Sequence, residues 1–473
     1  MEAVSRELPR PYRVWVPTVR PPILNMFMCK PLRDPSSFVS QRASALGNLG
    51  RLGAPGVRHD MYVHIPVCFG KCTFCAVETK EIREVVQLVP RYVAALHREL
   101  DMYAAYPAVR NSEFGVVYIG GGTPSILSAE HLHKLVSRLV TEFSCRGATV
   151  TVEGNSTSFT QEKLAAIREA GATRVSIGVQ SFDKRLSGML ETPHDPEEIG
   201  RWVEMARSTG FEHLNLDLIA GLPGDDLASL ERDIEAGLSL RPTSLSVYDL
   251  MLVPHTPLAR AVRGGNVGSM PDARGYVERL SLTRSKLEGL GWANVYGNTY
   301  SAVRDGVELP AGPPSGNGAC LAVGSSSYGM LADHHYVNNG SMIKYMEAVE
   351  RGEFPVFGGR IAATPWQKAE HALIDLCFHL AMDREAFRGK VGVDVVDLAG
   401  RRLARLERKG LLEIDERQVR LTDLGKVWSG RVCGTLLGPG HLLRLLSMKV
   451  MSELFGRMPE RVRQRMKERA GRG

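Results

Sequence analysis

Three cysteines lie within eight residues of one another: Cys68, Cys72 and Cys75, spaced C-x3-C-x2-C. They follow a short β-type run at 61–65, so they lie on a loop after a strand. Thiol groups this close cannot each be buried separately in a core. A zinc ion would need a fourth ligand, for which His64 is near in sequence. Three cysteines on one loop better suit a [4Fe-4S] cluster with one iron free of protein ligands.

Glycines and carboxylates follow other predicted strands. Gly120, Gly121 and Gly122 come after a strand at 115–119, where backbone can approach a ligand closely, although a tight turn would explain them too. Glu153 ends a strand at 149–153 and could accept hydrogen bonds from an ammonium or ribose group. Asp217 interrupts an apolar strand, so we expect it to have a cationic or hydroxyl partner, either a ligand or a structural ion pair.

Six strands alternate with helical patterns, which predicts a parallel sheet with right-handed crossovers. The strands are expected at 61–65, 115–119, 149–153, 174–179, 214–219 and 245–250. The helices are expected at 90–105, 129–141, 160–170, 183–190, 196–208, 229–240 and 272–290. Six units are too few to close an eight-stranded barrel, so we predict an α/β fold with an open, partial (β/α)6 barrel. Its chemistry should lie at the carboxyl ends of the strands.

The rest of the chain has a different character. Residues 1–58 are proline-rich and predict an irregular arm before a barrel at 59–300. A Gly/Pro-rich stretch at 305–318 falls within a predicted linker and barrel-completing segment at 301–360. Helical patterns at 365–380 and 394–408, followed by strands at 410–414 and 418–422, predict a winged-helix-like α+β domain at 361–430. A basic helical tail is expected at 431–473.

Composition favours an ordinary globular protein. The chain has 473 residues, of which 44% are hydrophobic and 23% charged, and a net charge of +7. Much of that charge lies at 457–473, so we expect no nucleic-acid partner for the body of the chain. No apolar run is long enough to span a membrane, and the first residues do not form a secretory signal. We therefore expect a cytoplasmic protein, not bound to a membrane, and a monomer.

Several segments together resemble a known family. They are Tyr62–Cys68 with the cysteine loop, Gly120–Pro124, Arg174–Phe182, Asn215–Gly224 and Leu421–Gly425. On these segments the chain is identified as a member of the radical S-adenosylmethionine (SAM) superfamily. It resembles the group of oxygen-independent coproporphyrinogen III oxidase, which includes heme chaperones and class C radical SAM methyltransferases and cyclopropanases.

The resemblance implies a [4Fe-4S] cluster on Cys68, Cys72 and Cys75 and two SAM molecules side by side. Residues matching the shell of the first SAM are Tyr62, Gly121, Glu153, Met251 and Tyr328. Residues matching the shell of the second are Phe74, Gly122, Thr123, Gln180 and Asp217. With the three cysteines, Gln180 and Asp217 are the predicted catalytic residues; both are expected past strand ends, facing the barrel mouth.

Two positions depart from the oxidase pattern. Val77 stands where the oxidase has a fourth cysteine, and Thr192 where it has an arginine near the second SAM. Both differences weaken the case for coproporphyrinogen decarboxylation, and the loss of a guanidinium removes a strong contact to anions.

The leading hypothesis is therefore a methyltransferase or cyclopropanase that acts on an sp2 carbon of a small-molecule natural product, with an electron donor such as flavodoxin or ferredoxin. The alternatives are oxidative decarboxylation of coproporphyrinogen III, a heme-binding chaperone without turnover, and a tRNA-modifying enzyme. The arm at 1–58 offers no evident heme motif, which counts against the chaperone.

Overall fold

One open sheet of twelve strands organises the protein. The computed structural model describes residues 49, 52, 57–145, 147–192, 195–253, 256–304, 307–308, 319–331, 334–362 and 364–437. The strand order is β16-β15-β14-β13-β1-β4-β5-β6-β7-β8-β10-β9. The six predicted strands are β1 (Arg58–Ile65), β4 (Glu113–Gly121), β5 (Thr149–Gly154), β6 (Arg174–Gln180), β7 (His213–Ala220) and β8 (Ser244–Asp249). They run parallel as successive neighbours, and the sheet does not close, so the predicted partial barrel is confirmed.

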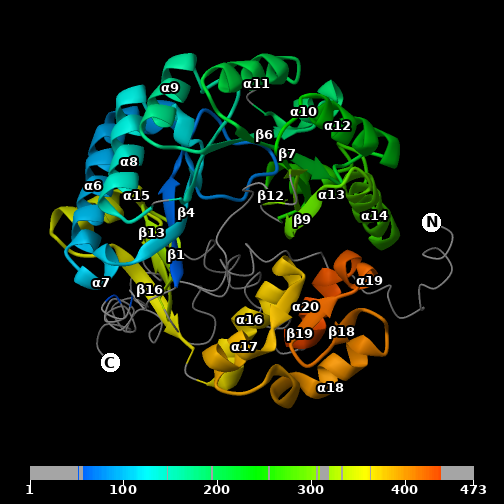
Figure 1. Cartoon of the computed structure of the whole chain (residues 1–473). Coiled ribbons are helices and arrows are strands. Elements are labelled where there is room, and N and C mark those ends of the chain that lie inside the picture. The colour runs from blue at the N-terminus through cyan, green and yellow to red at the C-terminus, as the bar shows by residue number, and fades with distance from the viewer. Residues whose placement is uncertain are drawn as a thin grey trace.

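Helices cover the outside of these strands (Figure 1). They are α6 (Val89–Ala104), α8 (Ala129–Glu142), α9 (Gln161–Glu169), α10 (Lys184–Leu190), α11 (Glu198–Ser208), α12 (Leu227–Ser239), α13 (Pro257–Arg263) and α14 (Ala273–Gly289). Side-chain caps begin several of them; the Asp226 carboxylate, for example, accepts a hydrogen bond from the Ser229 amide at the start of α12. Apolar stripes face the strands, as with Leu132, Leu135 and Leu139 of α8, all fully buried.

The sheet extends beyond the six predicted strands at both edges. At one edge are β13 (Cys320–Val323), β14 (Tyr328–Leu331), β15 (His334–Asn338) and β16 (Val356–Ile361), and at the other β9 (Ala293–Tyr296) and β10 (Thr299–Ser301). β13 is parallel to β1, which makes it a seventh parallel strand. These strands are short and carry little apolar alternation, so sequence pattern gave no signal for them.

A buried carboxylate joins this added edge to the first helix. Glu99 of α6 accepts hydrogen bonds from the Tyr345 hydroxyl (2.6 Å), the Asn338 side-chain amide (2.8 Å) and the Gly324 backbone N–H (2.8 Å). Burial raises the pKa of Glu99 to about 7, although all three hydrogen bonds lower it. Tyr345 lies on α15 (Met342–Glu350), so one side chain ties α6 to β13, β15 and α15.

The shorter elements connect or border these. They are β2 (Val67–Cys68), β3 (Lys80–Glu81), α5 (Ile82–Val85), η3 (Val86–Leu88), α7 (Pro107–Arg110), η4 (Pro124–Ile126), β11 (Val303–Arg304) and β12 (Val307–Glu308). The predicted arm at 1–58, most of the stretch at 305–318, and the tail from 438 onward lie outside the described residues.

The elements of the C-terminal part lie together (Figure 1) and have their own hydrophobic core. Its elements are α16 (Pro365–His379), β17 (Ala381–Asp383), α17 (Arg384–Val391), α18 (Val395–Glu407), β18 (Leu412–Ile414), β19 (Gln418–Leu421), α19 (Asp423–Val427) and α20 (Ser429–Leu437). The sheet order β17-β19-β18 fits the predicted winged-helix-like module, to which the structure adds β17 and α17. Arg402 of α18 lies over the Trp366 ring at 4.5 Å, so this basic side chain serves packing.

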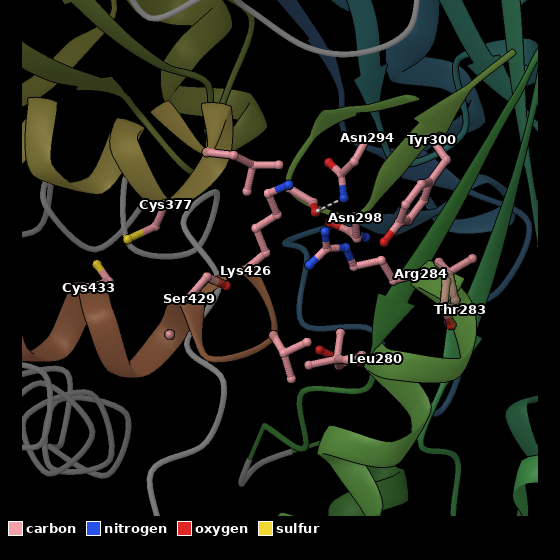
Figure 2. A pocket seen from close by; sticks show the side chains of 16 residues that line it. Leu280, Thr283, Arg284, Asn294, Asn298, Tyr300, Cys377, Lys426, Ser429 and Cys433 are labelled. Atoms are coloured by element: carbon pink, nitrogen blue, oxygen red, sulfur yellow. Dashed lines mark hydrogen bonds between the residues drawn. The ribbon is translucent and has the colours of Figure 1, made fainter. Parts of the chain in front are cut away.

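A small cavity separates this part from the barrel (Figure 2). It measures about 60 Å³ and lies between β8–β10 with α14 on one side and α16, α19 and α20 on the other. Arg284 of α14 closes the contact by donating to the Asp423 carboxylate and to its backbone oxygen (2.8 Å for the latter). None of the predicted site residues lines this cavity, so the candidate site lies elsewhere.

Gly425 provides a test of the packing in the C-terminal part. A Cβ at this position would collide with the backbone oxygen of Leu411, which cannot swing away as a flexible side chain could. We expect Gly425→Ala to lower the free energy of unfolding of this part by about 1–3 kcal/mol, measured by urea titration. Gly434→Ala is the matched control, because a Cβ there meets nothing within 4 Å. Equal stability of the two variants would contradict the packing described.

Candidate active site

The three cysteines lie on one loop beyond the carboxyl end of β1. Cys68 ends β2, which pairs with β3, so the loop is closed at its base. Within it the Cys75 amide donates to the Cys72 backbone oxygen at 3.1 Å. All three thiols are partly exposed and none forms a disulfide. The loop therefore presents three free sulfur ligands at the rim of the barrel.

The barrel helices hold this loop in place from the side. The Thr73 amide donates to the Leu190 backbone oxygen (3.0 Å), and the Thr73 hydroxyl to that of Met189 (3.1 Å), both at the end of α10. On the other flank, the Leu258 amide of α13 donates to the Thr73 backbone oxygen at 2.9 Å. Phe74 packs on a small apolar cluster that includes Leu190. The loop is thus anchored at the residues between the second and third cysteines.

Two of the thiols, Cys68 and Cys72, resist ionisation in the protein alone. Burial, together with repulsion from the adjacent Cys75 and Cys68, raises the pKa of Cys72 to about 12. Burial also raises the pKa of Cys68, against a hydrogen bond from the Thr123 hydroxyl at 3.5 Å. Iron cations bound to the thiolates would reverse this balance.

Within the described ranges, no three His, Cys, Asp or Glu side chains converge to hold a single metal ion. A cubane is a different case, since each thiolate binds a separate iron. Three free thiols on one loop are the donor set that such a cluster takes.

The triple glycine packs tightly against neighbouring protein atoms on the side where a side chain would lie. A Cβ on Gly120 would lie 2.5 Å from a Glu153 oxygen, one on Gly121 2.6 Å from the His64 ring, and one on Gly122 2.5 Å from the Val67 backbone oxygen. Gly121 also has a φ of +111°, which other residues rarely adopt. The glycines therefore allow the end of β4 to contact the chain leading into the cysteine loop.

Glu153 joins that contact from the end of β5. It accepts a hydrogen bond from the Gly121 backbone N–H at 3.2 Å and one from the Tyr118 hydroxyl. Burial raises the pKa of Glu153 to about 7. The hydrogen bond from Tyr118 lowers it, and the negative charge of Asp217 raises it. At neutral pH the protonated and ionised forms of the Glu153 carboxyl group are therefore comparably populated.

Tyrosine rings surround this carboxyl group. The Tyr62 ring lies 6.4 Å from those of Tyr118 and Tyr328, centre to centre, and the Tyr62 hydroxyl is 2.8 Å from His64 Nδ1. Four residues predicted for one SAM shell, Tyr62, Gly121, Glu153 and Tyr328, therefore lie together. Met251 follows β8 and is partly exposed.

Gln180 has an unusual backbone. It ends β6 with a φ of +68°, and the pairing with β7 shifts register between Gly178 and Gln180. A side chain in this conformation costs about 1–3 kcal/mol, and such strain is concentrated at functional sites. Gln180, expected just past the end of its strand, is the last residue of β6.

Asp217 lies inside β7, within the strand expected at 214–219, and not past the end of that strand. It is opposite Gly178 and Ser246, and both of its oxygens have partners: Asn215 Nδ2 at 2.7 Å and the Ser176 hydroxyl at 3.3 Å. An amide and a hydroxyl group of the protein thus supply the partners predicted for this partly buried carboxylate. Burial raises the pKa of Asp217, and the charge of Arg174 lowers it.

Sequence reasoning missed several residues of this interior: Tyr118, Arg174, Asn215, Ser244, Ser246 and Tyr248. The signal for them is present in β6, where Arg174, Ser176, Gly178 and Gln180 alternate with buried valine and isoleucine. Alternation of period two indicates a strand with one face free of large apolar side chains. Treating β7 as an apolar strand interrupted by Asp217 misses the same polar inner face.

Glu153→Gln tests the burial of this carboxyl group. An acid whose pKa is raised on folding stabilises the fold below its unfolded pKa, and that contribution is lost as the pH rises through the folded pKa. We expect Glu153→Gln to match the wild type near pH 4 and to exceed it by about 3 kcal/mol above about pH 8, in urea unfolding.

The control is Glu130→Gln on the surface of α8, where Lys134 lowers the pKa of the carboxyl group. It should give no gain at high pH. A stability difference for Glu153→Gln that is the same at every pH would contradict the environment described here.

Comparison with known proteins agrees with this geometry. Residues 62–236 match the model of the radical SAM superfamily, and residues 376–428 that of the HemN C-terminal domain. The heme chaperone HemW of Bacillus subtilis is 30% identical over 380 residues, which cover 80% of this chain and 98% of that protein. The oxygen-independent coproporphyrinogen III oxidase of Pseudomonas aeruginosa is 26% identical over 393 residues, covering 79% and 84%.

Among solved structures, the coproporphyrinogen III oxidase HemN of Escherichia coli superposes with a TM-score of 0.70 at 22% identity. The match covers 82% of this chain and 92% of HemN. It supports the same fold for the barrel and the C-terminal part together.

These relatives overturn one expectation. The hypothesis of a C-methyltransferase or cyclopropanase is wrong, because the similar proteins are heme chaperones and a coproporphyrinogen oxidase. The physical reason is that a cluster loop and SAM-contacting residues do not encode the acceptor of the reaction.

A [4Fe-4S] cluster and SAM are the cofactors that the radical SAM domain implies. With a relative at 30% identity matched almost from end to end, the chain belongs to the radical SAM superfamily, in the family of HemN and HemW.

Proposed function

We propose that this protein is a heme-binding radical SAM protein of the chaperone type. The observation that carries the proposal is the match to HemW, which extends over 98% of that protein. The three-cysteine loop without a fourth cysteine is consistent with it. Val77, at the position where the oxidase has that cysteine, is 38% exposed on the same loop.

Cys68, Cys72 and Cys75 are the residues that would hold the cluster. Their thiols are free, partly exposed and on one anchored loop, which suits this group. When bound, the cluster supplies an electron to the sulfonium of SAM. Thr123 would keep a hydrogen bond on the Cys68 sulfur, which tunes such clusters.

SAM would bind between this loop and the barrel mouth. Tyr62, Gly121, Glu153, Met251 and Tyr328 are the residues proposed for its shell, with Glu153 as the acceptor for an ammonium or ribose group. Because the pKa of Glu153 lies near neutrality, a cation bound beside this carboxyl group would shift it toward its ionised form.

A second SAM molecule is a finer proposal. Phe74, Gly122, Thr123, Gln180 and Asp217 are the residues proposed for it, and the strained backbone of Gln180 supports a binding role at that strand end. Thr192 has no charge with which to bind the carboxylate of this second SAM molecule. The Thr192 hydroxyl instead donates to the Ser187 backbone oxygen at 3.4 Å. This loss favours the chaperone over the oxidase.

Exposed aromatic rings support a flat, apolar ligand. Phe69 of the cysteine loop is 45% exposed, and Tyr248, on the polar inner face of β8, is 39% exposed. Accessible aromatic rings suit stacking on a macrocycle. A flavodoxin or ferredoxin is the reductant proposed for the cluster.

Oxidative decarboxylation of coproporphyrinogen III is the second candidate. It is favoured by the retention of Gln180 and Asp217 at the barrel mouth, which a protein that only carries heme would not need.

Single replacements of the loop cysteines test the cluster assignment. Reconstituted anaerobically with iron and sulfide, the wild type should hold about four irons per chain and give a paramagnetic signal on reduction. Cys68→Ala, Cys72→Ala and Cys75→Ala should each lose most of both. Cys145→Ala is the control, because this thiol is buried and donates to the Leu139 backbone oxygen (3.3 Å). Full iron content in the loop variants would exclude the assignment.

Heme titration tests the function itself. We expect stoichiometric binding with a Kd of about 1 μM or below, followed by the Soret absorbance and by retention of heme through gel filtration. Phe69→Ala and Tyr248→Ala should each weaken binding, because they remove stacking area. Phe357→Ala, on β16, is the matched control, since its ring is 40% exposed.

Incubation of the reconstituted protein with coproporphyrinogen III, SAM and dithionite tests the oxidase alternative. Release of carbon dioxide and 5′-deoxyadenosine, without retention of heme, would replace the chaperone proposal with the oxidase.

A further inference from the structure

A chain of hydrogen-bonded side chains runs through the barrel interior to Asp217. It begins at Arg174, at the start of β6, which is only 2% exposed. The Arg174 guanidinium donates to the Ser244 hydroxyl of β8 at 3.2 Å and to the Thr151 hydroxyl of β5 at 3.5 Å. Its Nε has no hydrogen-bond partner among the described residues. A buried cation is thus held by hydroxyl groups.

The chain continues through Asn215 of β7. The Ser244 hydroxyl donates to Asn215 Oδ1 at 2.8 Å, and Asn215 Nδ2 donates to Asp217 Oδ1 at 2.7 Å. Asn215 Nδ2 also donates to the Ser176 hydroxyl (2.9 Å), which in turn donates to Asp217 Oδ2 (3.3 Å). Both carboxylate oxygens therefore receive hydrogen bonds from this chain.

The direction of every link follows from the end at Arg174. A guanidinium can only donate, so the Ser244 oxygen accepts from it and the Ser244 proton is left to face Asn215. That proton requires Asn215 to present its oxygen to Ser244, and its NH2 group consequently faces Asp217. Ser246 adds a second donor to the same Asn215 oxygen at 3.3 Å. The orientation of the amide is thus set mainly from the Arg174–Ser244 end of the chain of hydrogen bonds.

Charge acts in the same direction as the hydrogen bonds. Burial disfavours the ionised form of a carboxyl group and raises the pKa of Asp217, whereas Arg174 and the hydrogen bonds from Ser246, Asn215 and Ser176 lower it. These groups therefore oppose the effect of burial and favour the ionised form of Asp217, which accepts hydrogen bonds.

We propose that Arg174, Ser244 and Asn215 are positioning residues for Asp217. They keep its carboxylate ionised and oriented, so that it can accept hydrogen bonds from the ammonium or ribose hydroxyl groups of SAM. The inference rests on the proposed function only in taking SAM as the ligand of the barrel. None of the three is a catalytic residue, since each acts through Asp217.

The pH dependence of SAM binding tests this inference. Affinity is measured by anaerobic equilibrium dialysis with the reconstituted protein, so no turnover is needed. For the wild type we expect affinity to fall at acid pH in two steps, as Glu153, whose pKa is about 7, and Asp217 take up protons; the Glu153 step is common to all the variants compared. In Arg174→Gln and Ser244→Ala the midpoint of the Asp217 step should move to higher pH by about one unit, with an approximately tenfold loss of affinity below it and recovery above it.

Two further variants separate positioning from general damage. Arg174→Lys keeps the charge and should leave the midpoint within a few tenths of a unit of the wild type. Ser112→Ala removes another buried hydroxyl, which donates to the Ala108 backbone oxygen (2.7 Å) far from this chain, and should change nothing. A uniform loss of affinity at every pH in Arg174→Gln and Ser244→Ala would overturn the inference.

A second measurement does not depend on SAM. Asp217→Asn should raise the melting temperature more at pH 8 than at pH 5, because it removes a buried acid that is costly only when ionised. The pH-dependent gain should be larger in the Ser244→Ala background than in the wild type. If the wild type bound no SAM, the proposed SAM site would fail, but the melting temperatures would still test the inference. Equal pH-dependent gains from Asp217→Asn in the two backgrounds would overturn the inference.

Discussion

The close approach of three strand ends is the constraint on which the rest of the site depends. Gly120, Gly121 and Gly122 leave no room for a side chain, because Glu153, the His64 ring and the backbone before Cys68 already fill the space. The Gly122 and Thr123 amides donate to the Ile65 and Val67 backbone oxygens at 2.8 Å, which extends the pairing of β1 and β4 into the cysteine loop. The thiols and the Glu153 carboxyl are thus placed at one rim.

Beneath this rim the barrel interior is polar, and the charged groups there shift the pKa values of their neighbours. Glu153 and Asp217 raise each other's cost of ionisation, and burial raises both further. Arg174 is the buried cation that offsets them, while hydroxyl and amide groups on alternate strand positions supply hydrogen bonds. This interior supports the proposal of a cationic ligand, because such a ligand would offset the charge of the two carboxylates.

Much of the fold could be predicted from local pattern. Each of the six central strands and the helices between them agree with the sequence prediction to within a few residues, since apolar periodicity and capping residues act locally. Within the expected barrel-completing segment at 301–360 the individual strands β13–β16 were not predicted, because β13 pairs with β1, far along the chain, and β14–β16 are added in turn onto β13. The methyltransferase hypothesis was wrong for another reason: the motifs specify the cluster and SAM, and they are shared by relatives with different substrates.

The sequence by itself determined the chemistry of the ligands, namely three thiols at C-x3-C-x2-C spacing and strands with polar residues at every second position. Both are local properties of a loop and of the strand pleat. Only the tertiary structure decided that Asn215 turns its amide toward Asp217 and that Gln180 adopts a left-handed backbone. Those features depend on the register between neighbouring strands, which is set by packing across the whole sheet.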